Sequence, residues 1–400
     1  MKTKISLDGV WQRIDQIKKA NQIKVLEAFK QAGVQNSHYA WVTGYGYDDL
    51  GKDKLDELYA AYFNTEAALV RPQLVSGTHA IASAIFGNLN SGDRLVAIGQ
   101  PYDTLQTVFN KWSKKFGIDY YPNVILSEAS GSQCGIKEIL TSQAPQDDKR
   151  NLFFIQRSRG YEWRDSYSLN FIAELIEQIK SNSPQAIVFV DNCYGEFTQE
   201  QEPTDIGADI IAGSLIKNPG GGIVAAGAYI AGRESLVENA AEFMTAPGIG
   251  KHGGCNFDQT RLMMQGFFMA PLIVSEALKG MSYAAKVFEE LGLETLPAYD
   301  AERNDIIQAI KFNNRDKLIE FCRLVQTNCP VNSMFAPVPD AISGYDDEII
   351  MASGSFIEGS SIELSADGPL REPYIGYFQG GLSSAHTIYV VDLIAEALSK

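Results

Sequence analysis

The chain has 400 residues, of which 45% are hydrophobic, and its formal net charge is −15 at pH 7. A surface this acidic repels nucleic acids and anionic lipids, so we expect neither as a partner. No apolar run reaches the roughly 18 residues of a membrane span, and the N-terminus has no apolar segment typical of a secretory signal. We therefore expect a cytoplasmic protein of two or three domains.

Cysteine and histidine usage points to the same compartment and predicts no metal site. The four histidines show no His-x-x-x-His spacing. The cysteines are odd in number and form no Cys-x-x-Cys pair, which favours free thiols in a reducing compartment. They are Cys134, Cys193, Cys255, Cys322 and Cys329.

The first segment, residues 1–36, is expected to be helical because its apolar residues recur at helical spacing. A glycine loop at 43–49 follows and carries Tyr45 and Tyr47. This loop is either a tight turn with two surface aromatics or a segment that reaches a binding pocket, and the sequence leaves both interpretations open.

A candidate anion site follows the next predicted strand. Residues 67–70 are predicted as that strand and 80–86 as a helix, with Ser76, Gly77 and Thr78 between them. Free backbone N–H groups at a helix N-terminus bind phosphate, and hydroxyl groups add donors. Ordinary helix capping explains the same residues equally well.

Two later strands each lead to a residue suited to a flat cofactor. The strand at 95–98 leads to Tyr102, whose ring either stacks on a planar group or lies on the surface. The strand at 187–190 leads to Asp191, which needs a positive partner such as a pyridinium nitrogen, unless it caps the next turn. Continuously apolar strands that alternate with amphipathic helices predict a mostly parallel sheet, whose carboxyl edge binds ligands.

Lys217 follows the apolar strand predicted at 210–212, in a run that ends with Pro219 and three glycines. Desolvation there is expected to lower the lysine pKa from about 10.4 and to free the amine as a nucleophile. Such an amine forms Schiff bases, and pyridoxal phosphate (PLP) is the usual aldehyde partner. Taken alone, a surface lysine in a glycine turn is the simpler interpretation. Residues 223–231 are predicted as the next strand and 258–291 as mostly helical.

The character of the chain changes after that helix. We predict a large α/β domain at 37–292 and a smaller α+β domain at 293–400, with strands at 348–352 and 361–364. Arg371 lies in the smaller domain between two prolines. A stiffly held guanidinium suits bidentate capture of a carboxylate, although a salt bridge to a nearby acid is favoured for this residue alone.

Five motifs, taken in order along the chain, carry a resemblance to a known family. They are Thr43-Gly44-Tyr45-Gly46-Tyr47, Ser76-Gly77-Thr78-His79-Ala80, Asp191-Asn192-Cys193-Tyr194-Gly195-Glu196-Phe197, Gly213–Gly222 and Gly376-Tyr377-Phe378-Gln379-Gly380-Gly381. The chain resembles fold type I PLP-dependent enzymes, the aspartate aminotransferase superfamily. Within it, the chain is similar to the cysteine and methionine metabolism branch, and more narrowly to the methionine γ-lyase-like or aluminium-resistance proteins.

The resemblance implies a role for each matching position. Lys217 would be the Schiff-base lysine and proton carrier, and Asp191 the partner of the pyridine nitrogen. Tyr102 would stack on the ring, and our own hypothesis is that it also protonates the leaving group. The remaining matches would be ligands: Ser76, Gly77, Thr78 and Ser214 for the phosphate, Arg371 for the substrate carboxylate, and Tyr47 or Tyr45 for the neighbouring subunit's site. That last role implies a homodimer or homotetramer.

The chain departs from the wider branch at two places. Ile216 stands where the branch has a threonine before the lysine, and Tyr47 stands where it has an arginine. One phosphate hydroxyl and one positive charge are therefore missing. Arg157 or Arg159 is our hypothesis for the replacement of the charge.

We predict a PLP-dependent carbon–sulfur lyase that acts on a small sulfur amino acid, methionine or cystathionine, by β- or γ-elimination. An aminotransferase would use every one of these residues and is the enzymatic alternative. The non-enzymatic alternative is a cation-binding stress protein, suggested by the acidic composition and by the aluminium-resistance name of the family it resembles.

Overall fold

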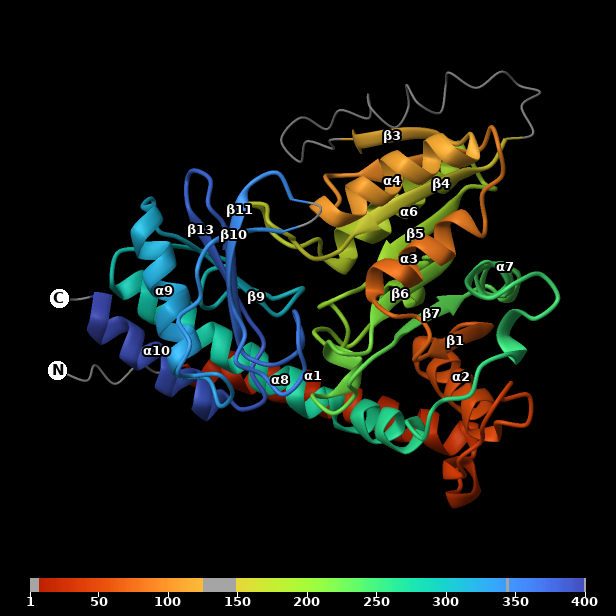
Figure 1. Cartoon of the computed structure of the whole chain (residues 1–400), viewed down its shortest axis with the longest axis horizontal. Helices are drawn as coiled ribbons and strands as arrows, with labels where there is room; N and C mark the ends of the chain where they lie inside the picture. The colour runs from red at the N-terminus through yellow and green to blue at the C-terminus, as the bar shows by residue number, and fades with distance from the viewer. Residues whose placement is uncertain (1–6, 125–148, 343–344, 399–400) are drawn as a thin grey trace.

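The computed structural model describes residues 7–124, 149–342 and 345–398 (Figure 1). Cys134 lies outside the described residues. The helices are α1 (Asp8–Ala32), α2 (Leu50–Phe63), α3 (Gly77–Phe86), α4 (Asp103–Phe116), α6 (Leu169–Asn182), α7 (Glu234–Met244), α8 (Thr260–Glu290), α9 (Arg315–Thr327) and α10 (Ser384–Leu398). The strands are β1 (Ala67–Arg71), β2 (Arg94–Ile98), β3 (Asp119–Val124), β4 (Asn151–Gln156), β5 (Ile187–Asp191), β6 (Ile210–Ser214), β7 (Ala228–Gly232), β8 (Glu294–Leu296), β9 (Ile307–Lys311), β10 (Asp340–Ala341), β11 (Glu348–Ala352), β12 (Ser365–Pro369) and β13 (Ile375–Gln379).

The large sheet has the order β1-β7-β6-β5-β4-β2-β3. Its strands from β6 to β3 are parallel, and β7 is antiparallel to both of its neighbours. Helices α3, α4 and α7 pack on one face, and α2, α6 and α8 on the other (Figure 1). Because both faces are covered, every residue of β2, β4, β5 and β6 is buried. The predicted α/β fold with a mostly parallel sheet is confirmed.

The small sheet is antiparallel, with the order β10-β11-β12-β13-β9-β8. Helices α9 and α10 pack against it around a second core. The 31-residue helix α8 contacts α1 and α2 and then continues to β8, β9 and α10, so it joins the two sheets (Figure 1). Within the described residues, none of the helices is both long and apolar enough to cross a membrane.

The strand predicted at 223–231 begins five residues late, as β7 at Ala228. Two local features delay it. The Val224 N–H donates to the Gly220 carbonyl in a turn, and Gly227 adopts a φ of +109°, a conformation that side chains disfavour. The loop between β6 and β7, which carries Lys217 and is called the lysine loop below, is therefore longer than the sequence suggested.

The strand predicted at 361–364 is displaced to β12, which begins at Ser365. The Ile362 N–H donates instead to the Ile216 carbonyl in the lysine loop, at 3.0 Å. This bond fastens the small sheet to the loop that carries Lys217. The displacement also brings Asp367 into a buried strand.

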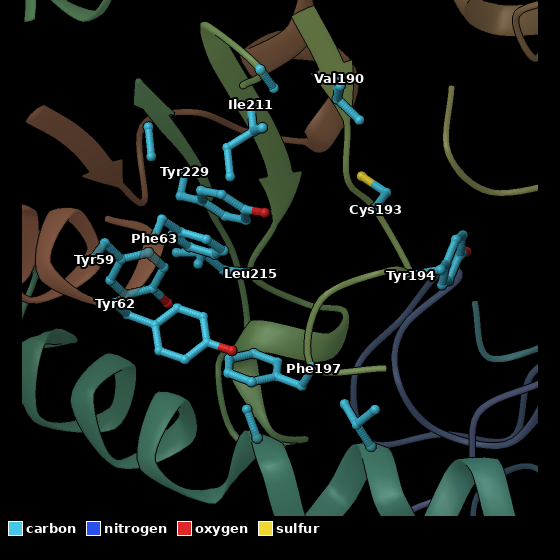
Figure 2. Packing of buried hydrophobic residues seen from close by; sticks show 14 of the residues in the cluster. Tyr59, Tyr62, Phe63, Val190, Cys193, Tyr194, Phe197, Ile211, Leu215 and Tyr229 are labelled. Atoms are coloured by element: carbon cyan, nitrogen blue, oxygen red, sulfur yellow. The ribbon is translucent and has the colours of Figure 1, made fainter. Parts of the chain in front are cut away.

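An aromatic cluster packs α2 against β7 (Figure 2). The rings of Phe63 and Tyr229 are stacked with centroids 5.0 Å apart, and Tyr62 lies edge-on to Phe63, also at 5.0 Å. Aromatic pairs of this kind contribute about 0.5–1.5 kcal/mol beyond the area that they bury. The cluster fixes Tyr229, whose hydroxyl donates to Glu196 at 3.0 Å.

Replacement of Phe63 by alanine should lower the free energy of unfolding by about 3–5 kcal/mol, because it leaves a cavity among fully buried rings. Urea unfolding followed by circular dichroism measures the change. The matched control is Met334→Ala at a side chain that is 86% exposed, where we expect less than about 0.5 kcal/mol. Equal losses in the two variants would contradict the packing described.

Candidate active site

A cavity of about 290 Å³ lies where the carboxyl ends of β4, β5 and β6 face the small sheet. Strands β12 and β13 form the opposite wall. Seven of the predicted residues line it: Ser76, Gly77, Thr78, Tyr102, Asp191, Ser214 and Lys217. A larger hollow of about 590 Å³ beside α2 and β1 contains none of the predicted residues.

The N-terminus of α3 forms one end of the cavity. Ser76 caps the helix, and its hydroxyl oxygen accepts the N–H three residues later at 3.1 Å. The N–H groups of Gly77 and Thr78 lie in the first turn, where no intrahelical acceptor is within reach, so they can bind an anion. A Cβ on Gly77 would stand 3.2 Å from Cys193 Sγ and 3.3 Å from Ser214 Cβ. Glycine is what lets α3 and β6 approach this closely.

Tyr102 immediately precedes α4, and hydrogen bonds hold both its side-chain hydroxyl and its backbone N–H. Its hydroxyl lies 2.6 Å from Thr78 Oγ1, and its N–H donates to Gln156 Oε1 at 3.0 Å. Burial, together with the charge of Asp191, raises the pKa of the phenol well above its ordinary value. The ring is therefore a neutral aromatic surface near pH 7.

Lys217 lies three residues beyond the end of β6, in a turn where its N–H donates to the Ser214 carbonyl at 3.3 Å. Its Nζ lies 3.5 Å from the centroid of the Tyr194 ring, a cation–π contact. Burial, the largest effect, lowers the pKa of this amine, but Tyr194, Cys193 and Asp191 together raise it above its ordinary value. The predicted lowering is therefore wrong for the free lysine, because it counted desolvation without these neighbours.

Asp191 ends β5 and is buried at the floor of the cavity. Its Oδ1 accepts the Cys193 N–H at 3.1 Å. Burial raises the pKa of the carboxyl group, while hydrogen bonds from Cys193 and the charge of Lys217 oppose the rise without cancelling it. A second positive charge beside Asp191 would therefore be needed to hold it firmly ionised.

Tyr194 is a cavity residue that the sequence did not single out. Its φ is +70°, which is rare for a bulky side chain and marks a strained turn. Its hydroxyl accepts from Gln379 Nε2 at 3.3 Å and donates to the Ser360 carbonyl at 3.4 Å. The sequence signal that could have identified Tyr194 is its position shortly after Asp191, the carboxylate that ends β5. Figure 2 shows Cys193 and Tyr194 where the chain leaves β5.

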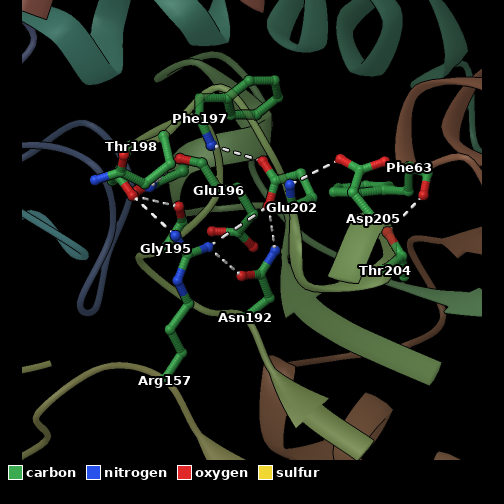
Figure 3. Close-up of polar contacts among 12 residues, drawn as sticks. Phe63, Arg157, Asn192, Gly195, Glu196, Phe197, Thr198, Glu202, Thr204 and Asp205 are labelled. Atoms are coloured by element: carbon green, nitrogen blue, oxygen red, sulfur yellow. Dashed lines mark hydrogen bonds and ion pairs between the residues drawn. The ribbon is translucent and has the colours of Figure 1, made fainter. Parts of the chain in front are cut away.

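A buried charged cluster lies behind this turn (Figure 3). Arg157 donates to Asn192 Oδ1 at 2.8 Å and lies 3.6 Å from the Glu202 carboxylate. Burial lowers the pKa of Arg157 and raises that of Glu202, and their mutual attraction opposes both shifts. Arg159 is similarly paired with Asp305 at 3.6 Å. Neither arginine lines the cavity, so neither guanidinium occupies the place that our charge-replacement hypothesis requires.

Arg371 lies outside the cavity. Its side chain is half-exposed, and Nη1 donates to the Asp347 carboxylate at 3.1 Å. It lines a neighbouring groove of about 200 Å³ that shares Tyr161 and Tyr377 with the cavity. The salt-bridge alternative therefore describes the arginine in this structure, with Asp347 as the acid. Its role in carboxylate binding stays a prediction.

Tyr45 and Tyr47 are also remote from the cavity of their own chain. They are 79% and 58% exposed, and their rings stack on each other with centroids 5.8 Å apart. Their loop is anchored by Lys52, whose Nζ donates to the Gly46 carbonyl at 2.8 Å. Any contact of these tyrosines with a binding site would have to be with that of another subunit.

The small sheet contributes side chains that the sequence did not assign. Asp367 on β12 pairs with Tyr377 on β13, and both line the cavity together with Gln379. Burial raises the pKa of Asp367 to about 7, although a hydrogen bond with Tyr161 and the charge of Lys217 act to lower it. A lone acidic residue within a buried strand was the signal that could have identified Asp367.

Comparison with known proteins gives consistent results over the whole chain. A model of the methionine gamma-lyase family matches residues 1–399. An uncharacterized protein of Bacillus subtilis is 43% identical over 394 residues, which cover 96% of this chain and 92% of the relative. Solved structures from Clostridium acetobutylicum and Listeria monocytogenes, each provisionally named a cystathionine beta-lyase involved in aluminum resistance, give TM-scores of 0.92 and 0.91. They are 46% and 45% identical, covering 98% and 97% of this chain and 93% and 96% of theirs.

If the chain binds PLP as the resemblance implies, replacement of Gly77 by alanine should weaken that binding roughly tenfold, because crowding against Cys193 and Ser214 costs about 1–3 kcal/mol. Titration of the cofactor-free protein with PLP, followed by absorbance, measures the affinity. Gly9→Ala is the control, because a Cβ there meets nothing within 4 Å, and it should bind PLP as the wild type does. Unchanged affinity in Gly77→Ala would argue against α3 as the phosphate site.

Proposed function

The chain belongs to the methionine gamma-lyase family, and on that premise we propose that it is a PLP-dependent carbon–sulfur lyase. Its substrate would be a small sulfur amino acid, methionine or cystathionine. The observation that carries the proposal is that Lys217, Asp191 and the N-terminus of α3 face one cavity. An amine, a carboxyl group and an anion site are what the aldehyde, ring nitrogen and phosphate of PLP require.

The residues of the cavity fit this cofactor in shape and in chemistry. Gly77 leaves space beside Ser214, and the hydroxyls of Ser76, Thr78 and Ser214 together with the helix N-terminus suit a phosphate. Asp191 is buried and lacks a sufficient counter-charge, which a protonated pyridine nitrogen would supply. The aromatic ring of Tyr102 would stack on the face of the cofactor ring.

Bound at these residues, PLP would supply an electron sink for the bonds at the substrate Cα. Lys217 Nζ would accept the Cα proton, and the contact with the Tyr194 ring would steady the resulting ammonium group. A protonated group elsewhere in the cavity would protonate the sulfur atom as the carbon–sulfur bond breaks. The products would be a thiol, ammonia and a 2-oxo acid.

We further propose that the active unit is a homodimer or homotetramer in which Tyr47 or Tyr45 enters the neighbouring site. Trp41 and Leu50, on the same segment, are also exposed, at 68% and 61%. Clustered exposed aromatic and aliphatic side chains are typical of protein interfaces. A cytoplasmic location is part of the proposal, and the free state of the four described cysteines supports it.

Product analysis with methionine, cystathionine and cysteine tests the reaction. Release of 2-oxobutyrate with a thiol would indicate γ-elimination, and pyruvate would indicate β-elimination. Lys217→Ala should reduce thiol release by roughly 10²–10⁴-fold, because it removes the proton acceptor. Lys30→Ala, on the exposed face of α1, is the control. Amino-group exchange without thiol release would instead identify an aminotransferase.

The shared site predicts complementation between two inactive variants. In hybrids of Lys217→Ala with Tyr47→Ala, one site in each mixed dimer would combine an intact lysine with an intact tyrosine. Random mixing of dimers should then restore about a quarter of wild-type activity. Activity is measured after the variants are unfolded and refolded together, with each variant refolded alone as the control. If Tyr47→Ala is fully active, or if mixing restores nothing, the tyrosine does not complete the neighbouring site.

A further inference from the structure

We propose that Asp367, held by Tyr161, donates the proton to the leaving sulfur atom when the carbon–sulfur bond breaks. The inference rests on the proposed lyase function and assigns to this chain a proton donor on the small sheet. From the sequence alone, our hypothesis gave that proton to Tyr102, which directly precedes α4.

The position of Asp367 suits a donor to the substrate side chain. It lies in the middle of β12, opposite Tyr377 on β13, and both strands form the wall that faces Lys217. Asp367 is only 7% exposed, and its carboxyl group shares a hydrogen bond with Tyr161. A substrate whose Cα lies near Lys217 must extend its sulfur away from the floor of the cavity, and the small-sheet wall is the surface that encloses the other side.

Four other proton-bearing side chains of the cavity are poorly suited. Burial raises the pKa values of the Tyr102, Tyr345 and Tyr377 phenols, which makes them weaker acids. Tyr102 also has its hydroxyl engaged with Thr78 at 2.6 Å. Burial likewise raises the pKa of the Cys193 thiol well above its ordinary value.

Asp367 differs because the pKa of its carboxyl group is close to neutral pH. Burial raises its pKa to about 7, and the groups that oppose the rise are Tyr161 and Lys217. Cys322 of α9 and the Tyr345 and Tyr377 phenols also face it. A general acid works best when its pKa lies near the working pH, and an alkyl thiol has a pKa of about 8.5, so transfer from Asp367 to a thiolate is favourable.

The step balances without any further reactant. The C–S bond breaks, and its electron pair stays on sulfur. A new S–H bond forms with the proton of Asp367, which becomes a carboxylate. The new C=C bond of the product takes the electron pair of the C–H bond that is broken on the carbon next to the C–S carbon, which is Cα–H in β-elimination and Cβ–H in γ-elimination. The carboxylate of Asp367 regains a proton from water before the next turnover.

The decisive test varies the leaving group. For an alkyl thioether on whichever carbon skeleton the wild type accepts, Asp367→Asn should reduce kcat/KM roughly 10²–10⁴-fold. For the corresponding nitrophenyl thioether, whose thiolate leaves without a proton, the loss should be less than about threefold, since no general acid is needed. Asp316→Asn, at an exposed carboxylate in the first turn of α9, is the matched control and should behave as the wild type with both substrates.

A pH profile adds a readout that a structural role would not change. The wild-type kcat/KM for the alkyl thioether should fall as pH rises above about 7, because Asp367 loses its proton. Tyr161→Phe removes a hydrogen bond that lowers the pKa of Asp367, so this fall should move to higher pH. A pH profile that is unchanged in Tyr161→Phe would contradict the proposal, and this variant serves even if Asp367→Asn does not fold.

The cofactor-free protein provides a test that is independent of turnover. A carboxyl group with a raised pKa stabilises the fold when protonated, and this stabilisation is lost as pH rises toward the folded-state value of about 7. The melting temperature of the wild type should therefore fall relative to Asp367→Asn between about pH 5 and pH 7, and the difference should be level above that range. A difference independent of pH would show that Asp367 does not titrate near neutrality, and the proposal would be wrong.

The lyase function and the role of Asp367 can be overturned separately. If the wild type releases thiol from alkyl thioethers and Asp367→Asn does so equally well, or loses both substrates equally, this inference is overturned while the lyase function stands. If the wild type releases no thiol from any thioether, the proposed function is overturned and this inference with it.

Discussion

The buried ion pair between Arg157 and Glu202 is the constraint on which the cavity around Lys217 depends. The two side chains are 0% and 1% exposed, and a single charge left in that environment would cost several kcal/mol. Asn192 joins the pair with hydrogen bonds of 2.8 and 2.9 Å and directly follows Asp191. The pair therefore fixes the turn after β5 (Figure 3). That turn carries Tyr194 at a positive φ and places its ring beneath Lys217.

Both sheets line the cavity, and each contributes different chemical groups to it. The large sheet and the helices packed on it provide the amine, the strand-end carboxyl group and the N-terminus of α3. The small sheet provides Asp367, and the bond from the Ile362 N–H to the Ile216 carbonyl fastens it to the lysine loop. Among the described residues that line the cavity, Lys217 is the one lysine or arginine. A bound anion would thus be met mainly by hydroxyls and the α3 N-terminus.

Prediction from local sequence patterns was accurate for the strands of the large sheet that are buried on both faces. The continuous apolar runs of β4, β5 and β6 were predicted to within one or two residues, because strands of a covered parallel sheet have no polar face. Two strand starts were wrong. A local turn and the positive φ of Gly227 delay β7, whereas β12 begins late because the Ile362 N–H bonds to the distant Ile216 carbonyl. The lysine pKa was wrong for the same reason. Desolvation can be inferred from one segment, whereas the effects of Tyr194 and Cys193 require knowing which groups surround the amine.

By itself, the sequence determined the fold class, the family resemblance and the set of large-domain residues at the carboxyl edge of the sheet. Parallel strands necessarily bring those ends together, so Tyr102, Asp191 and Lys217 could be grouped from their positions after apolar runs. Only the tertiary structure decided that Asp367 faces the cavity and that Arg371 is paired with Asp347 outside it. The physical reason is that the placement of Asp367 opposite Lys217 depends on how two sheets pack, and no local pattern encodes that packing. The acid that Arg371 meets lies 24 residues away, and which acid that is depends on the path of the chain between them.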